Sequence, residues 1–362
     1  MAIRTDTFFG ANTPVGFVSL FDELYDPYGR GKTVILKGGP GTGKSTLMRR
    51  VAEKALDNGF DTECAHCGSD PHSLDAVRVK ALQFSVCDGT PPHVVEPKFP
   101  GVCETIVNLG AFWNEQALRE NAGEIRRLTV ENSLCHRRAT RFLAAAGSLS
   151  DETRAFCAPF VLEEKLNGYA LRFCGRELPK KKGAAPGKRF CRFLEGFTPE
   201  GSVFYEQTLR ALGPRVIALR DEGTGTANRL LEYLETRARA AGFDVVVGLD
   251  PLHPKAAPTS LAIPEADLAL TVLESGRTLQ LPADRTVHMR RFFAPEFLRE
   301  HKNYLAFQNE MQQTLLQRNG QLLRQAKEIH DALERYYIAA MDFDALETET
   351  ERLLDRLFEC AR

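Results

Sequence analysis

The residues best suited to do chemistry lie in a glycine-rich segment near the start of the chain. The apolar run Val34–Leu36 is followed by Gly38-Gly39-Pro40-Gly41-Thr42-Gly43-Lys44-Ser45, which matches the pattern GxxxxGK followed by Ser or Thr. Glycines allow backbone amides to turn toward phosphate groups, and a helix that starts after the segment points its positive end at them. We expect Lys44 to bind the β- and γ-phosphates of a nucleotide and the Ser45 hydroxyl to ligate Mg²⁺, with Thr46 supporting that contact.

A metal ion beside such a loop needs a second acidic ligand, normally an Asp at the end of an apolar strand. Phe84–Asp88 has this form, so we assign Asp88 as the metal-associated carboxylate and count it with Lys44 among the catalytic residues. The alternative is an Asp that caps the turn before Gly89. Gly89 also stands where many ATP-driven motors carry a Glu that activates water, which weakens a motor interpretation.

Asp70 is the third candidate catalytic residue, because it follows another predicted strand, Thr62–His66. The carboxyl ends of parallel strands surround the ligand, so Asp70 could orient a nucleophile near the γ-phosphate, with His66 close by. An equally good interpretation is that Asp70 caps a short helix around Leu74.

A proline-rich segment, residues 90–101, would leave the same edge of the sheet. It carries the polar residues His93, Glu96 and Lys98. Loops at this edge tend to carry binding residues, and the alternative is a rigid connection that binds nothing.

The chain is an internal duplication. Gly31–Gly43 aligns without gaps on Gly213–Gly225. Shorter matches keep the same order at nearly the same spacing, as in Gly59-Phe60-Asp61 with Gly242-Phe243-Asp244, and Leu118-Arg119-Glu120 with Leu298-Arg299-Glu300. Two copies of one unit explain these matches.

The second copy has lost the chemistry of the first. In the ungapped alignment Lys44 becomes Thr226 and Ser45 becomes Ala227, while Asp221 and Glu222 take glycine and proline positions. Two carboxylates in the loop would repel a triphosphate. We expect a degenerate loop that keeps the fold and serves a structural or regulatory role, or else binds a different ligand, even a cation.

Each copy alternates short strands with helices, which predicts an α/β fold of tandem P-loop NTPase-like domains, each a parallel sheet covered by helices on both faces. In the first copy the predicted strands are Thr33–Leu36, Thr62–His66, Phe84–Cys87 and Glu104–Leu109. The predicted division is an N-terminal domain, 1–178, a basic Gly/Pro linker, 179–189, and a C-terminal domain, 190–362.

Each domain is expected to carry a helical arm, at about 112–173 and about 295–360. Leu315, Leu322, Ile329 and Tyr336 recur every seven residues, and a helix with its own apolar face follows the turn at 341–344. We predict an antiparallel helical hairpin, and a similar one in the first copy with its turn at 147–151. The arms would pack on their own domains, or serve self-association or a protein partner.

Composition limits the classes of function. The 362 residues are 43% hydrophobic and 26% charged, which is typical of a globular protein, and 47 Lys and Arg balance 48 Asp and Glu. This balance argues against nucleic acid as a partner. Apolar runs are too short to cross a bilayer, and the start lacks a signal-peptide pattern, so we expect no membrane association and a cytoplasmic location.

Three segments, GGPGTGKSTLM, HCGSDPHSLD and DGTPPHVVEP, together with the tandem layout and the late helical arms, carry a resemblance to a known family. The chain resembles an uncharacterised bacterial family of tandem P-loop ATPase-like, ATP-binding proteins over nearly its whole length. The resemblance implies nucleotide-binding roles for Gly38 to Thr46 and for Asp88, and brings no substrate. Members of that family can keep a phosphate loop in both copies, and this chain departs from them in its second copy.

The expected function is Mg²⁺-dependent ATP hydrolysis at the N-terminal domain, by attack of water in line with the bond that breaks. The absence of an Asn-Lys-x-Asp tetrapeptide disfavours GTP. One alternative is a small-molecule or nucleotide kinase that uses Asp70 as its base. Another is an ATP-dependent switch with little turnover, whose arms open or close on a protein partner.

Overall fold

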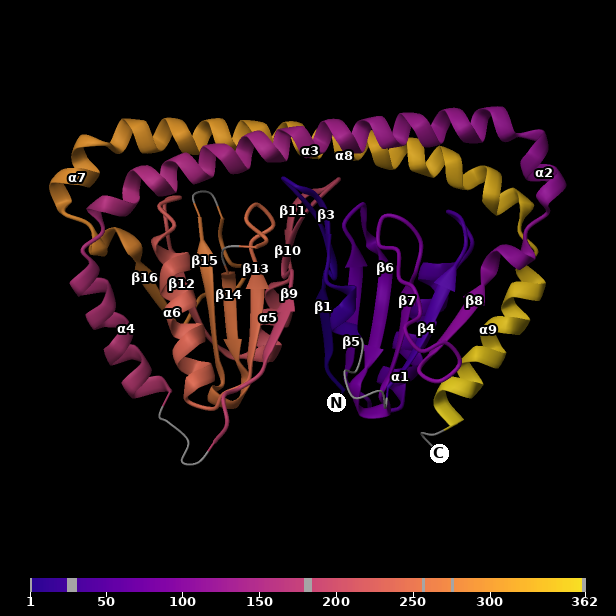
Figure 1. Ribbon diagram of the computed structural model, residues 1–362, viewed down its shortest axis with the longest axis horizontal. Coiled ribbons are helices and arrows are strands. Elements are labelled where there is room, and N and C mark those ends of the chain that lie inside the picture. The colour runs from indigo at the N-terminus through magenta and orange to yellow at the C-terminus, as the bar shows by residue number, and fades with distance from the viewer. Residues whose placement is uncertain (1, 25–30, 179–183, 256–257, 275–276, 360–362) are drawn as a thin grey trace.

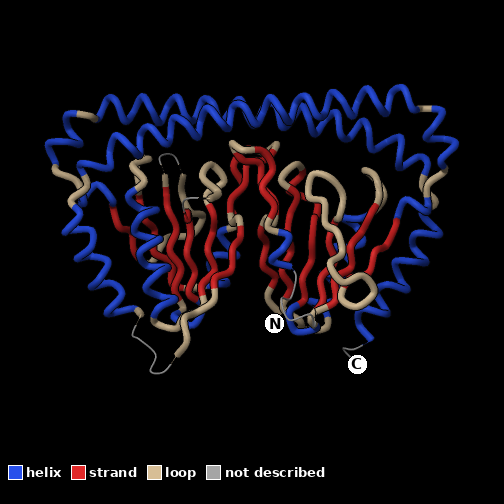
Figure 2. Tube along the Cα trace, in the orientation of Figure 1, coloured by secondary structure: helices blue, strands red, loops and turns tan. Residues whose placement is uncertain are grey.

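The computed structural model describes residues 2–24, 31–178, 184–255, 258–274 and 277–359 (Figure 1). They form two α/β lobes bridged by two long helices that run side by side across both lobes (Figure 2). We call the lobe built around the first copy's strands the first lobe and the other the second lobe. Residues 179–183 of the predicted linker lie outside the described residues.

The first lobe holds a six-stranded mixed sheet in the order β1-β5-β6-β7-β4-β8. Its strands are β1 (Arg4–Thr7), β4 (Lys32–Lys37), β5 (Thr62–Cys67), β6 (Asp70–Val79), β7 (Phe84–Asp88) and β8 (Glu104–Asn108). A two-stranded ribbon, β2 (Gly10–Thr13) with β3 (Gly16–Ser19), rises from its edge beside the other lobe. The four strands predicted from the sequence of this copy are confirmed to within one residue at either end.

Two expectations for this sheet are wrong. The sheet is not all parallel, because β6 runs antiparallel to β5 and β7. No helix forms around Leu74, which lies in the ten-residue strand β6. Near its end, Val77 and Val79 are buried β-branched residues that favour a strand, and the turns at either end are short enough to reverse the chain.

The second lobe repeats this sheet in the order β9-β13-β14-β15-β12-β16. Its strands are β9 (Arg189–Arg192), β12 (Arg215–Arg220), β13 (Val245–Leu249), β14 (Pro258–Ile263), β15 (Leu268–Leu273) and β16 (Arg285–His288), with the ribbon β10 (Glu195–Thr198) and β11 (Gly201–Phe204). The same strand order in both lobes, with β14 in the place of β6, supports the duplication seen in the sequence.

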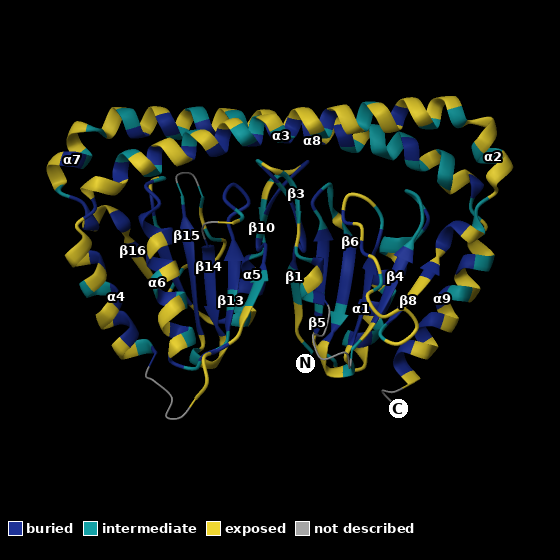
Figure 3. Cartoon of the chain, in the orientation of Figure 1, coloured by how far each residue is buried: buried dark blue, intermediate teal, exposed yellow. Residues whose placement is uncertain are grey.

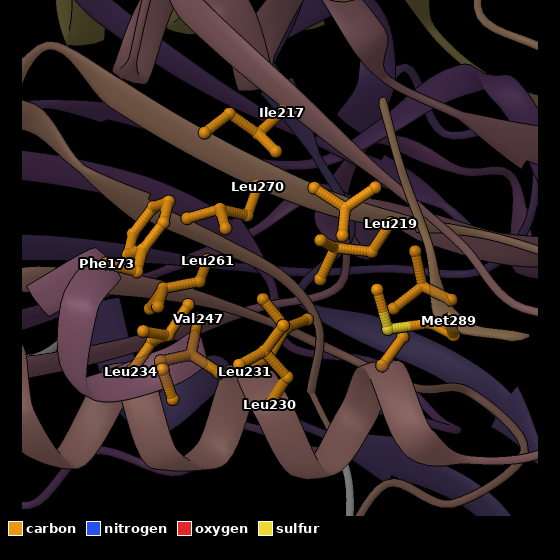
Figure 4. Packing of buried hydrophobic residues seen from close by; sticks show 14 of the residues in the cluster. Phe173, Ile217, Leu219, Leu230, Leu231, Leu234, Val247, Leu261, Leu270 and Met289 are labelled. Carbon is orange, nitrogen blue, oxygen red and sulfur yellow. The ribbon is translucent and has the colours of Figure 1, made fainter. Parts of the chain in front are cut away.

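Helices cover the sheets unequally. In the second lobe, α6 (Thr226–Ala240) and α4 (Glu163–Glu177) pack on one face, where Leu230, Leu231 and Phe173 meet the sheet (Figure 4), and α5 (Glu206–Leu212) packs on the other. In the first lobe, α1 (Lys44–Asp57) and α9 (Phe343–Phe358) cover one face. The other face is covered by the short 3₁₀ segment η1 (Phe21–Leu24) and the loop around Val95.

The arms differ from the predicted hairpins. α3 (Ala122–Cys157) runs without a break through the residues expected to turn, and the chain bends at η4 (Ala158–Phe160) instead. α8 (Lys302–Ala340) pairs with α3, not with α9, and both leave their sheets through short helices, α2 (Glu115–Glu120) and α7 (Pro295–Glu300). The seven-residue apolar repeat is satisfied by the matching helix of the other copy: Leu322 packs with Leu143 and Ala139.

Each arm ends on the lobe of the other copy. Trp113 forms a β-bridge with Met341, and Val161 forms the equivalent bridge with Phe293. α9 thereby enters the core of the first lobe, and α4 enters the core of the second. The division of the sequence into repeats and the division of the structure into packed lobes therefore do not coincide.

The two sheets also meet edge to edge. Phe8 and Phe193 exchange backbone hydrogen bonds of 2.9 and 3.2 Å, and the buried Arg192 guanidinium pairs with Glu63 across the same junction. The strands are largely buried, whereas α3 and α8 expose many residues on their outer side (Figure 3). Among the helices described here, none combines the length and apolar character needed to cross a membrane.

Candidate functional site

The glycine-rich segment forms a loop between β4 and α1, as predicted. Gly41 and Gly43 have φ angles of 68° and 81°, a left-handed conformation that favours glycine, and Gly43 directly precedes α1. No side chain caps the start of this helix. In the described part of the chain, one side chain, Glu334, accepts a hydrogen bond from a backbone amide of residues 38–45. The loop thus has the backbone form that presents amides to an anion.

Lys44 lies across this loop. Its Nζ donates to the carbonyl oxygens of Gly38 and Gly39, at 3.1 and 2.7 Å, and lies 3.6 Å from Asp88 Oδ2. The Lys44 and Asp88 side chains are each 12% exposed. The two predicted catalytic residues are therefore adjacent and shielded from water, where a charge interacts more strongly than at the surface.

Ser45 and Thr46, the other residues assigned to the metal contact, begin α1. The Ser45 hydroxyl accepts a hydrogen bond of 2.9 Å from the Leu74 amide in the middle of β6, and Thr46 is exposed. Asp88 ends β7, directly beside β4, and its Oδ1 accepts from the Thr90 amide and hydroxyl. Asp88 therefore caps the following turn, as the alternative interpretation expected, and keeps Oδ2 toward Lys44.

Asp75, Asp88 and His93 form a buried cluster behind Lys44. His93 Nε2 lies 3.9 Å from Asp75 Oδ1 and 3.9 Å from Asp88 Oδ2. Burial raises the pKa of Asp75 to about 6; the neighbouring His93 ring opposes that shift and the Asp88 carboxylate adds to it. Two acidic groups and an imidazole this close together can share a proton or hold a cation.

The last turns of α8, which belongs to the second copy, cover the loop. Glu334 Oε1 accepts from the Gly41 amide at 3.2 Å. A Cβ atom on Gly39 would lie 2.9 Å from Tyr337 and 3.2 Å from Trp113, so the backbone packs directly against these rings. The hydrogen bond from His330 lowers the pKa of Glu334, which keeps its carboxylate charged.

Asp70 lies at the same end of the strands as Asp88 but contacts other groups. Its Oδ2 is 3.4 Å from Lys327 Nζ on α8 and accepts from Ser73 Oγ at 3.0 Å. Lys327 and Glu334 are seven residues apart on one helix, which places their positions about 10 Å apart along the axis. His66 bonds to Asp6 and to the Pro71 carbonyl. The structure therefore groups Lys44 with Asp88 and sets Asp70 and His66 apart from them.

The second loop is one residue shorter than the first. β4 and β12 have the same burial pattern and start at residues 32 and 215, an offset of 183, whereas the glycines that precede α1 and α6, Gly43 and Gly225, are 182 apart. The ungapped alignment therefore pairs equivalent residues at the end of the loop, whereas in the strand it pairs residues that are one position out of register. Asp221 and Glu222 replace three residues, Gly38 to Pro40.

An internal carboxylate fills the second loop. Asp221 accepts hydrogen bonds from the Thr224 amide and hydroxyl, at 2.8 and 2.7 Å, and from the Ala227 amide at 2.8 Å. It is 2% exposed. These are loop and first-turn amides of the kind that a phosphate loop offers to its ligand. Asp221 thus acts as a built-in anion, a stronger obstacle to a triphosphate than repulsion alone.

The helix that covers the second loop carries a positive charge there, opposite to the Glu334 carboxylate over the first loop. Arg154, on α3 of the first copy, lies against Gly225 and pairs with Asp250 at 2.9 Å. Burial disfavours ionised Asp250, but hydrogen bonds from His253 and Arg154 lower its pKa to about 2. Burial also raises the pKa of the nearby Glu274 to about 7, with the charge of Asp250 adding to the shift.

Asp75, Glu334 and Arg154 were missed by the sequence interpretation. One signal was present: Arg154 and Glu334 are separated by the same interval as the Leu-Arg-Glu matches at 118–120 and 298–300. Asp75 stands between Leu74 and Ala76 in the buried part of β6, and a buried carboxylate needs a compensating partner. Comparison of the chain with family models, curated proteins and solved structures gives no match.

Proposed function

We propose that the first lobe binds ATP with Mg²⁺ and hydrolyses it, and that the second lobe binds no nucleotide. The observation that carries the proposal is Lys44, held by the carbonyls of its own glycine loop beside the buried carboxylate of Asp88. A lysine in this position can leave the loop carbonyls for phosphate oxygens without crossing open solvent. The tandem P-loop ATPase-like family that the sequence resembles agrees with this function.

The residues present fit a nucleotide and its metal. Backbone amides of the loop and the start of α1 would bind the phosphates, and Lys44 would bind the β- and γ-phosphate oxygens. Ser45 and Asp88 would hold Mg²⁺, and the bound ion would offset the negative charge that develops on the phosphates. Lys44 offsets part of the same charge, and the ends of α8 and η3 (Leu109–Phe112) exclude water from the loop.

The contact between Glu334 and Gly41 favours the second candidate function, a switch. A charged carboxylate on a loop amide competes with a phosphate for that amide, so ATP would have to displace the end of α8. α8 is paired with α3 and is joined to α9 by two residues, so its movement would reach both lobes. A kinase that uses Asp70 has less support, because Asp70 is ion-paired with Lys327.

The test is calorimetric titration of Mg·ATP into the chain, with phosphate release measured on the same sample. We expect one site per chain, and a loss of affinity of about 100-fold or more in Lys44→Ala, which removes charge-assisted contacts worth about 3 kcal/mol. Asp88→Asn should lower the release rate by about tenfold or more while the fold is kept. Two equivalent sites, or affinity unchanged by Lys44→Ala, would overturn the proposal; tight binding with negligible release would select the switch.

A further inference from the structure

The trio of Asp75, Asp88 and His93 is built like the ligand set of a metal ion. The three side chains come from β6, the end of β7 and the loop after it, and all are buried. Each offers one ligand atom, and these atoms lie within 4.8 Å of one another. Two ligands of an ion held at about 2.1 Å are separated by about 3.0 Å when they are at right angles and by about 4.2 Å when they are opposite. The two observed separations of 3.9 Å lie inside that range.

The trio also has unused ligand atoms. Among the described residues, neither ring nitrogen of His93 nor Oδ2 of Asp75 has a hydrogen-bond partner. Both side chains are at least nine-tenths buried, with 5% of each residue exposed. A buried polar atom without a partner costs free energy, and a bound cation would supply the missing partner.

The ring of His93 is held in place for this role. It stacks on Phe21, with ring centroids 4.8 Å apart and planes within 3° of parallel. The stacking fixes the plane of the imidazole and leaves its edge, with Nε2, toward both carboxylates. An ordered imidazole loses little freedom when it binds an ion, which favours binding.

The charges favour a cation at this trio, most strongly when Lys44 is engaged elsewhere. Lys44 is 3.6 Å from Asp88, and its charge also favours the ionised form of Asp75. If Lys44 turned to a phosphate, two buried carboxylates would share one imidazole. Buried charges without a partner are strongly unfavourable, and a divalent ion would neutralise both carboxylates.

We propose that Asp75, Asp88 and His93 bind a divalent transition-metal ion, of which Mn²⁺ and Zn²⁺ are the test cases. An imidazole ligand favours these ions over Mg²⁺, which prefers oxygen ligands alone. The site needs no nucleotide, because all three ligands come from the chain. It goes beyond the proposed function in assigning His93 and Asp75, and shares Asp88 with it.

The experiment measures Mn²⁺, Zn²⁺ and Mg²⁺ binding to the full nucleotide-free chain by equilibrium dialysis, with the electron paramagnetic resonance signal of free Mn²⁺ as a second readout. We expect one saturable Mn²⁺ site per chain and a preference for Mn²⁺ over Mg²⁺ of about tenfold or more. His93→Gln should remove that preference, and Asp75→Asn should weaken Mn²⁺ binding by about tenfold or more. The exposed histidine variant His72→Gln is the matched control and should bind as the native chain does.

Two results would overturn the proposal: no saturable Mn²⁺ or Zn²⁺ binding to the native chain, or binding that survives both His93→Gln and Asp75→Asn in folded protein. The preference for Mn²⁺ over Mg²⁺ is measured on the native chain, so the test stands even where a variant fails to fold. Lys44→Ala separates this proposal from ATP binding, because it should lose ATP and keep the metal. Metal binding without ATP binding would leave this inference standing and reject the proposed function.

Discussion

Helices α1 and α6 begin after glycines with nearly the same left-handed φ, 81° at Gly43 and 73° at Gly225, yet the loops before them are filled differently. The first loop keeps a lysine that reaches its own carbonyls, and one of its amides meets the Glu334 carboxylate of the covering arm. The second loop has no lysine, and Asp221 takes its amides. A glycine loop can thus be filled from within while the turn before its helix is preserved: in the second copy a carboxylate of the chain itself accepts from the amides.

The arms follow the same contrast. Arg154 reaches the second loop and Glu334 reaches the first, from equivalent positions of the duplicated sequence. Each arm carries a charge opposite to that of the loop it covers: a carboxylate meets the loop that holds Lys44, and a guanidinium meets the loop with carboxylates. The two copies have therefore diverged together, loop and covering arm.

The largest expected effect comes from removing the internal anion. Asp221→Ala would leave the amides of Thr224 and Ala227 buried without their acceptor, so we expect a loss of stability on the order of 2–4 kcal/mol, measured as a shift of the urea unfolding midpoint of the second lobe. The neighbouring Glu222 is exposed, so Glu222→Ala should change stability by less than about 0.5 kcal/mol. Equal effects of the two substitutions would show that Asp221 does not hold the loop.

The second prediction concerns pH. The pKa of Glu274 is about 7 in the folded chain against 4.5 for the free side chain, so the folded chain holds a proton that the unfolded chain releases. Stability should fall as pH rises from about 4.5 to about 7, and the loss should be complete above that window. Glu274→Gln removes this loss.

We compare the free energy of unfolding of Glu274→Gln with that of the native chain by urea unfolding at about pH 5 and at about pH 8. The difference in favour of the variant should be larger at pH 8 than at pH 5, by an amount on the order of 1–3 kcal/mol. Glu222→Gln, at an exposed position, is the control and should show no such difference. A variant with the same pH dependence as the native chain would contradict the assignment.

The smallest predicted effect tests the arm over the first loop. Glu334→Gln removes the charge that competes with phosphate at the Gly41 amide, so ATP affinity should rise about three- to tenfold, or about 1 kcal/mol. The measurement is calorimetric titration with Mg·ATP. Asp331→Asn, one turn earlier on α8 and paired with Lys327, should leave the affinity unchanged. Weaker binding in Glu334→Gln would mean that the carboxylate assists the site instead of closing it.

Local patterns predicted the loop and most of the first sheet correctly. The glycines and Lys44 are contiguous, and the strands are short apolar runs, so both signals lie within a few residues. The strand β6 was missed, and a short helix around Leu74 was expected in its place, because a strand and a short helix look alike when a segment is short and its pairing partners are unknown. Asp75 escaped notice because its neighbours in the site, Asp88 and His93, come only at the end of the next strand and in the loop after it.

By itself, the sequence determined the duplication, which shows when its two halves are compared. It also determined the intact first loop, the loss of lysine and hydroxyl in the second, and the long helix before residue 341, because each of these depends on residues close together in the chain. Tertiary structure alone decided which lobe each arm completes, since an apolar seven-residue repeat specifies a partner helix without naming it. It also decided that Asp221 fills the second loop and that Glu334 closes the first. The Glu334 contact joins residues 293 positions apart, whose distance is set by how the two copies pack. The Asp221 contacts lie within one loop and the helix turn after it, and they depend on the backbone conformation that the loop adopts in the fold.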